Sequence, residues 1–207
     1  MNNRINDLLN SRVPWDNLEL IDKQLARSLK WNKSSWKREL QKTSHLIAID
    51  FDDTLTILDY FALSKYINSY LPINYIDNIF GGNHRINLIK EAIKHQHSKG
   101  NIVVIVTNNM VDIVYKCLQE IQMDLLIPKN HIYGYQTMRD QPLPNKGIRL
   151  LDISKQFNIS GPSKIVLFDD DPNNCADVAE QGIKYINIEM GGGGMNNFDI
   201  MELKQCF

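Results

Sequence analysis

Three aspartates, Asp50, Asp52 and Asp53, stand within four positions, directly after the apolar run LIAI at 46–49. Like charges this close repel one another and stay ionised together only where a cation offsets them. A second acidic run, DDDPNN at 169–174, also follows an apolar segment. Carboxylates in such groups act as nucleophiles, as general acids and bases, or as ligands of a hard divalent cation.

Short apolar runs alternate with segments of helical period from residue 46 onward. The predicted strands are 46–49, 102–106, 131–135, 164–168 and 184–188. The predicted helices between them are 86–93, 111–121, 146–153 and 175–181. Strict alternation of strand and helix is typical of βαβ units with right-handed crossovers. The sequence therefore predicts an α/β fold with a central, mainly parallel sheet and helices on both faces.

The polar residues that could do chemistry follow the predicted strands. Thr107 and Asn108 come after the second strand, Lys146 opens the helix after the third, and the run at 169–174 follows the fourth. Parallel sheets bind ligands at the carboxyl ends of their strands, so these side chains should converge with Asp50 at one edge. Crowded oxygen ligands of this type suit Mg²⁺, and a bound cation would offset their mutual repulsion.

Four segments resemble the motifs of the haloacid dehalogenase-like (HAD) superfamily, in that family's order. They are DFDDT at 50–54, the strand that ends in Thr107, the isolated Lys146, and KIVLF followed by DDDPNN at 164–174. The resemblance covers roughly residues 46–188 and implies a HAD-like Rossmannoid fold.

The resemblance also implies roles for the acidic residues. Asp50 would be the nucleophile that forms an aspartyl-phosphate and would bind Mg²⁺ through its other oxygen. Asp52 would act as general acid and then general base, and its backbone carbonyl would face the metal. Asp170 would be a direct metal ligand, with Asp169 and Asn174 supporting it.

The phosphate would be held by the remaining motif residues. The resemblance assigns Thr107, the amide of Asn108 and Lys146 to the phosphoryl oxygens, with Lys146 also balancing the carboxylates. Asp53 and Asp171 read instead as loop or helix-cap residues.

Asp52 indicates which chemistry of the superfamily applies, because it supplies the acid and base that phosphate ester hydrolysis or transfer needs. A phosphatase is the first interpretation, and a mutase remains open because it needs the same acid and base. A metal-dependent nuclease is a rival that Thr107 and Lys146 disfavour. A catalytically inactive HAD-fold scaffold that binds a partner is the alternative of another class.

The substrate prediction rests on the short connections around the motifs. Ten residues separate Tyr135 from Lys146, and 30 residues at 55–84 separate Thr54 from the next predicted helix. The first is too short for a cap domain and the second suffices for a small flap, so we expect an open site. Such a site resembles the capless protein phosphatases of the superfamily, which predicts a phosphorylated protein or peptide, with phosphotyrosine favoured. A small phosphorylated metabolite or nucleotide is the alternative. Aromatic residues of the flap could line the rim or pack in the core: Tyr60, Phe61, Tyr66 and Tyr70.

The chain divides into three predicted parts: a helical extension at 1–44, a HAD-like core at 45–190, and a Gly-rich turn and tail at 191–207. An amphipathic helix is predicted around residues 18–29. The basic stretch at 30–42 contains Trp31 and Trp36. We interpret it as a solvated helix whose tryptophans pack on the core, with a phosphate- or nucleic-acid-binding patch as the alternative.

Composition limits the partners. The 207 residues carry a formal net charge of −1, which offers no overall positive field for nucleic acid or anionic lipid. Three cysteines without CxxC spacing suggest neither a disulfide framework nor a zinc site, and no signal peptide or membrane-length apolar run stands out. We therefore expect a cytoplasmic, reducing setting and no membrane segment in this chain.

Overall fold

The computed structural model describes residues 4–5, 8, 13–40, 44–57, 78–136, 143–191 and 193–207. Its strands are β1 (Leu46–Ile49), β2 (Ile102–Met110), β3 (Ile132–Tyr135), β4 (Ile165–Asp169) and β5 (Lys184–Asn187). Its α-helices are α2 (Leu20–Ser28), α3 (Lys33–Leu40), α6 (Gly82–Ser98), α7 (Val111–Glu120), α8 (Lys146–Gln156), α9 (Pro172–Glu180) and α10 (Asn197–Gln205). Short 3-10 turns are η1 (Trp15–Asn17), η3 (Lys129–His131) and η4 (Pro162–Lys164), and η2 (Phe51–Leu55) is a π-type turn.

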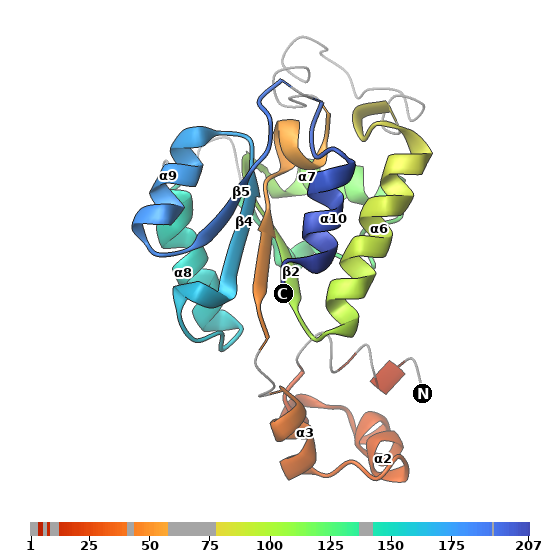
Figure 1. The fold of residues 1–207 in the computed structure, drawn as a ribbon. Coiled ribbons are helices and arrows are strands. Elements are labelled where there is room, and N and C mark those ends of the chain that lie inside the picture. Colours follow the sequence, from red (N-terminus) through yellow and green to blue (C-terminus); the bar gives the residue numbers. More distant parts are fainter. Residues whose placement is uncertain are drawn as a thin grey trace.

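The strands form one sheet in the order β3-β2-β1-β4-β5, and every pairing is parallel. The central strand β1 has partners on both sides, with Ile47 opposite Val103 of β2 and Val166 of β4. This is the α/β architecture that the alternation of apolar runs predicted. The carboxyl ends of the strands lie at the edge of the sheet opposite to α2 and α3 (Figure 1).

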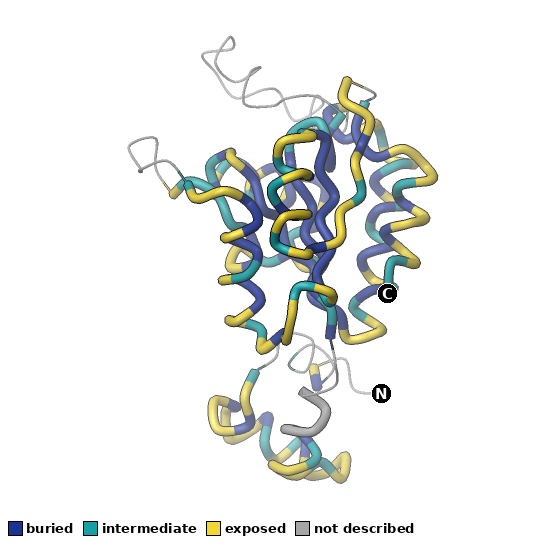
Figure 2. The backbone as a smooth tube through the Cα atoms, turned by 60° about the vertical axis from the view of Figure 1, so that its left-hand side comes forward, coloured by how far each residue is buried: buried dark blue, intermediate teal, exposed yellow. Residues whose placement is uncertain are grey.

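The side chains of β1 alternate between two hydrophobic cores. Ile47 and Ile49 join the core formed with α6, α7 and α10, whereas Leu46 and Ala48 join the core formed with α8 and α9. The two groups of helices accordingly cover opposite faces of the sheet (Figure 1), and β1, β4 and the first part of β2 are buried between them (Figure 2). Burying both faces explains why these three strands contain uninterrupted apolar runs, whereas the edge strand β5 is mostly exposed.

The C-terminal segment differs from the predicted Gly-rich turn and tail. Residues Asn197–Gln205 form α10, which packs beside α6 and contributes Ile200 and Leu203 to the core. A capping box starts this helix, because Asn196 accepts a hydrogen bond from the amide of Asp199 and Asp199 accepts one from the amide of Asn196. The glycine run before the helix obscured this start signal in the sequence.

The N-terminal extension has a small core of its own. Trp36 is fully buried, packs edge-on against Trp15 and Trp31, and donates a hydrogen bond from Nε1 to the carbonyl of Val13 at 2.9 Å. The tryptophans therefore pack on a core, as predicted, and this core belongs to the extension. The extension lies at the amino ends of the strands (Figure 1), away from the predicted site.

Among the described residues, no helix has both the length and the apolar character needed to cross a bilayer. Most of the predicted flap at 55–84 lies outside the described residues, and so does most of the short connection after Tyr135. The four aromatic residues predicted for the rim or the core, Tyr60, Phe61, Tyr66 and Tyr70, are among those not described. The prediction of an open, capless site therefore stays a prediction.

Candidate active site

The candidate catalytic loop, residues 50–57, begins where β1 ends and is called the catalytic loop below. Asp50 is anchored by its amide, which donates to the carbonyl of Phe168 in β4 at 2.9 Å. The chain then makes the turn η2, in which Asp53 takes the left-handed conformation with φ of 54°. Aspartate tolerates this conformation better than most residues because its short polar side chain can bond locally. The turn places Asp50 at the buried floor of the site and Asp53 in a loop position, as its sequence interpretation proposed.

Lys146 lies between two aspartates. Its ammonium nitrogen is 2.6 Å from Oδ1 of Asp50 and 2.6 Å from Oδ2 of Asp169, and the side chain is 2% exposed. Burial alone would lower the pKa of Lys146, but these two carboxylates raise it above its ordinary value. The lysine is thus held charged inside the site.

The pKa of Asp50 is raised to about 7, first by burial and then by the neighbouring charges of Asp169 and Asp52. Lys146 opposes this shift without cancelling it. The pKa is raised because burial disfavours the charged form more than Lys146 favours it. A cation bound at these carboxylates would stabilise the ionised form that a nucleophile requires.

Asp169 is fully buried, and its carboxylate is occupied by protein donors. Oδ1 accepts from Asn174 Nδ2 and from the amide of Asp171, each at 3.0 Å, while Oδ2 accepts from Lys146. The arrangement suits a residue that fixes the positions of others. Asp171 itself is the N-cap of α9 and accepts a hydrogen bond from the amide of Asn173.

Oxygen atoms of Asp50, Asp169 and Asp170 all lie within 4.8 Å of one another. Asp170 accepts a hydrogen bond from the hydroxyl of Thr54 at 3.0 Å, and burial raises its pKa. Hard oxygen donors in this arrangement fit Mg²⁺. Because three protein donors already bind the two oxygens of Asp169, Asp50 and Asp170 are the better direct ligands.

The side chain of Asp52 is outside this acidic group. Both of its oxygens accept from Asn109 Nδ2, at 3.0 Å and 3.3 Å. The metal role predicted for Asp52 belongs to its backbone carbonyl, and that role stays a prediction. Its carboxylate is held separately, as a general acid and base would need to be.

Thr107 and Asn108 lie in an irregular part of β2, beside the end of β3. Arg149 supports this segment, donating from Nη2 to the carbonyl of Thr107 at 2.7 Å and from Nη1 to Oδ1 of Asn108 at 3.1 Å. The hydroxyl oxygen of Thr107 accepts from the amide of Asn109 at 2.9 Å, so its hydrogen remains available to another acceptor. Asn108 is exposed, and Arg149 is 8% exposed.

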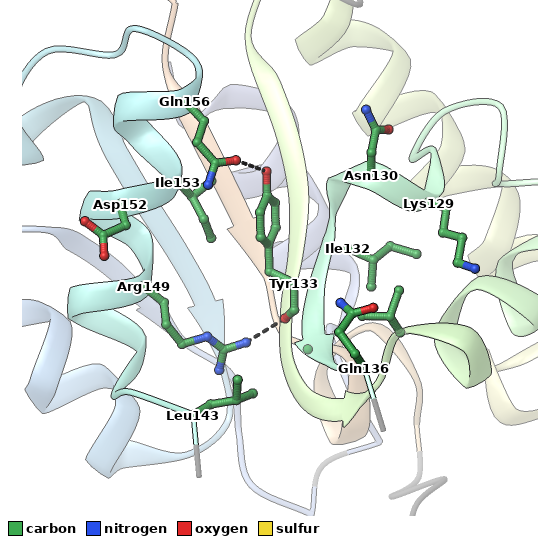
Figure 3. A pocket seen from close by; sticks show the side chains of 12 residues that line it. Lys129, Asn130, Ile132, Tyr133, Gln136, Leu143, Arg149, Asp152, Ile153 and Gln156 are labelled. Carbon is green, nitrogen blue, oxygen red and sulfur yellow. Dashed lines mark hydrogen bonds between the residues drawn. The ribbon is translucent and has the colours of Figure 1, made fainter. Parts of the chain in front are cut away.

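A cavity of about 630 Å³ lies beside this segment, along β3. Arg149 forms part of its wall and donates to the carbonyl of Tyr133 at 2.6 Å, while the hydroxyl of Tyr133 donates to Gln156 at 3.1 Å (Figure 3). The aspartates of the acidic group are not among the described residues that line it. The acidic group and this cavity are therefore neighbours linked through Arg149.

The catalytic loop is tied to the rest of the molecule by Arg85 of α6. The guanidinium donates to the carbonyls of Thr54, Leu55, Phe80 and Met195 at distances of 2.7 to 3.1 Å. Burial lowers the pKa of Arg85 to about 10. One side chain thus joins the loop, α6 and the segment that leads to α10.

Sequence reasoning missed four residues of this site: Thr54, Arg85, Asn109 and Arg149. Asn109 and Arg149 carried weak signals, since two asparagines follow Thr107 in a strand-like run and Arg149 stands one helical turn after Lys146. Arg85 carried none, because its partners are backbone carbonyls from segments far apart in the sequence.

No protein-family model and no curated protein sequence matches the chain. Among solved structures, a candidate β-phosphoglucomutase from Thermotoga maritima matches with a TM-score of 0.50 and 12% identity, over 78% of this chain and 97% of that one. The HAD domain of the effector protein Lem4 from Legionella pneumophila matches at 14% identity and a TM-score of 0.49, over 72% of this chain and 88% of that one. A candidate phosphatase from Clostridium difficile matches at 16% identity and a TM-score of 0.49, over 79% of this chain and 93% of that one.

At such identities the likeness concerns the fold alone. The chain shares an α/β fold with these structures, as the alternation of strands and helices predicted, and has an acidic site at the carboxyl edge of the parallel sheet.

Proposed function

We propose that this protein is a Mg²⁺-dependent phosphatase that hydrolyses phosphate monoesters through an aspartyl-phosphate on Asp50. The contact of Lys146 with both Asp50 and Asp169 carries the proposal. It places a buried positive charge beside a carboxylate at the carboxyl edge of the sheet, with Asp170 in reach of the same point. A nucleophile that attacks an anionic phosphate needs this local positive charge.

In the proposed reaction, a carboxylate oxygen of Asp50 forms a bond to phosphorus while the bond from phosphorus to the ester oxygen breaks. Asp52 gives its proton to the departing oxygen. A water molecule then attacks the phosphorus, Asp52 takes a proton from it, and the bond between Asp50 and phosphorus breaks to release phosphate. Mg²⁺, held by Asp50 and Asp170, would neutralise charge on the phosphoryl oxygens.

Lys146, Thr107 and the amide of Asn108 would bind the phosphoryl oxygens. Arg149 supports this role because it fixes the backbone and side chain of the 107–108 segment from behind. Orientation by such buried donors lowers the entropy cost of reaching the transition state.

For the substrate we favour a phosphorylated protein or peptide, with phosphotyrosine ahead of phosphoserine. The argument is the length of the connections: ten residues after Tyr135 and a 30-residue segment at 55–84 leave little chain for a closing cap. A long, rigid phenolic ring would reach an open site more readily than a short serine side chain. A small phosphorylated metabolite or nucleotide is the alternative, and it requires the 55–84 segment to close as a cap.

Turnover of 4-nitrophenyl phosphate with and without Mg²⁺ tests the reaction. We expect activity that vanishes with chelator and in Asp50→Asn, whereas Asp171→Asn should stay active because it changes only the cap of α9. A folded wild-type protein that turns over no phosphate monoester would support the alternative of a non-catalytic binding scaffold.

A substrate panel then tests the finer proposal. Phosphotyrosine peptides should exceed phosphoserine peptides and sugar phosphates in kcat/KM by about tenfold, which corresponds to about 1.4 kcal/mol in the transition state. A clear preference for a sugar phosphate or a nucleotide would overturn the open-site interpretation and leave the phosphatase proposal standing.

A further inference from the structure

Strand β2 contains a bulge that faces the catalytic loop. Val106 pairs with Tyr133 of β3, and the next pairing joins Met110 to Tyr135. Residues 107–109 of β2 therefore stand opposite the single residue Gly134. Bulges of this kind redirect side chains and are frequent near functional sites.

The bulge can form because residue 134 has no side chain. A Cβ atom at Gly134 would lie 2.4 Å from the backbone oxygen of Asn109, closer than any such contact in a folded protein. The backbone of the bulge thus fills the space that a side chain of β3 would occupy. Glycine at this position serves the close approach of two backbones.

The bulge presents the side chain of Asn109 in one orientation. Its Oδ1 accepts from the amide of Met110 at 2.7 Å, so the amide nitrogen is the end that faces Asp52. The backbone amide of Asn109 is also fixed, by the hydroxyl oxygen of Thr107 at 2.9 Å. With 1% of the residue exposed, Asn109 has neither the room nor the partners to turn over.

We propose that Asn109 is a positioning residue that holds the carboxyl group of Asp52 in place for proton transfer to the leaving oxygen. This inference rests on the proposed function. Asn109 touches both oxygens of Asp52, and it is the part of the site where β2, β3 and the catalytic loop meet. The side chain of Asp52 is only partly buried, so its rotamer depends on hydrogen bonds more than on packing.

Two substrates whose leaving groups differ in their need for a proton can distinguish loss of Asp52 positioning from a general loss of activity. Nitrophenolate departs without a proton, whereas the more basic phenolate of phenyl phosphate needs one. The two substrates have nearly the same shape, and kcat/KM reports events only up to departure of the leaving group. Their ratio therefore measures proton donation by Asp52 and cancels losses in binding that are common to both.

Asn109→Leu removes the contact at similar volume, and Asn109→Asp keeps both the shape and the bond from Met110 while removing the donor. We expect each to raise the ratio of kcat/KM for 4-nitrophenyl phosphate over phenyl phosphate by at least about tenfold, within the range of general acid catalysis. Asp52→Asn sets the upper limit of this ratio. Gly134→Ala should also raise this ratio, because the added Cβ displaces the bulge. Asn130→Asp is the control: Asn130 is exposed, and its substitution should leave the ratio unchanged.

An equal loss for both substrates in Asn109→Asp, or no loss, would overturn the positioning role while leaving the phosphatase proposal intact. Should Asn109→Leu fail to fold, the isosteric Asn109→Asp and Gly134→Ala on the neighbouring strand still decide. A wild-type protein inert toward both substrates in Mg²⁺ would overturn the proposed function and this role with it.

Discussion

Nζ of Lys146 lies 2.6 Å from Oδ1 of Asp50, in a place where 2% of the lysine side chain is exposed. A buried ion pair needs further hydrogen bonds to offset the desolvation of its charges. Asp169 supplies one of them to the lysine, yet the pKa of Asp50 stays raised. The site therefore holds Asp50, the proposed nucleophile, in an environment that stabilises its charged form incompletely.

Asp50→Asn should abolish turnover and stabilise the metal-free protein. The amide has nearly the same shape but cannot attack phosphorus, so we expect a loss of at least about a thousandfold in kcat. The pKa of Asp50 is raised on folding, so the folded chain holds this proton more tightly and wild-type stability falls as pH rises from about 4 to about 7.

In Asp50→Asn this part of the pH dependence should disappear. Urea unfolding of both proteins in chelator, at pH 5 and pH 7.5, measures the difference. A variant that is less stable than wild type at the higher pH would contradict the unfavourable environment assigned to Asp50.

Lys146→Met should destabilise the protein by roughly 3 kcal/mol, because it leaves two buried carboxylates without their shared cation. Methionine keeps much of the volume, so lost packing contributes little. Lys155→Met is the matched control: its ion pair with Asp152 at 2.8 Å is exposed and should be worth less than about 1 kcal/mol. Urea unfolding in chelator gives both values, and similar losses would contradict the special role of Lys146.

Mg²⁺ should stabilise the wild-type protein, and Asp170→Asn should weaken that effect. At a Mg²⁺ concentration about a hundredfold above Kd, binding to the folded state alone contributes about 2.7 kcal/mol. Asp171→Asn is the control, since asparagine caps a helix as well as aspartate does. Thermal unfolding across a Mg²⁺ titration checks both variants, and a wild-type Tm that does not respond would contradict a metal site at Asp50 and Asp170.

The strand and helix pattern could be predicted because buried parallel strands leave an apolar signature of fixed length. The strand β2 was the exception: it continues from the predicted end at Val106 to Met110 through polar residues of the bulge. Asn109 was missed for the same reason, since its role depends on where Gly134 lies opposite it. Helix α10 was missed because a glycine run hides its cap.

The aspartates, Thr107 and Lys146 could be named from the sequence because the carboxyl ends of parallel strands meet at one edge. Residues that act on the backbone, such as Arg85 and Arg149, leave no such pattern. Their partners are carbonyls, which every residue has, and only the folded chain decides which of them come within reach.

Arg85 should be needed to hold the catalytic loop in its conformation. Arg85→Lys keeps the charge but cannot reach the four carbonyls together, so we expect a loss of about 2 kcal/mol in stability, discounted for partial exposure, with a lower kcat. Thr54 transmits the effect, because its carbonyl accepts from Arg85 and its hydroxyl donates to Asp170.

Substitutions at the adjacent glycines Gly193 and Gly194 test the contact of Arg85 with the segment before α10. Gly194 has φ of 72°, and a Cβ there would lie 2.3 Å from the carbonyl oxygen of Thr56 and 2.7 Å from Nη2 of Arg85. Gly193 has φ of 83° with nothing within 4 Å, so Gly193→Ala carries only the backbone cost of about 1 to 2 kcal/mol. Gly194→Ala adds the clash, and we expect it to lower both stability and kcat further, as urea unfolding and steady-state kinetics would measure. Equal effects at the two positions would contradict the tie between the segment before α10 and the catalytic loop.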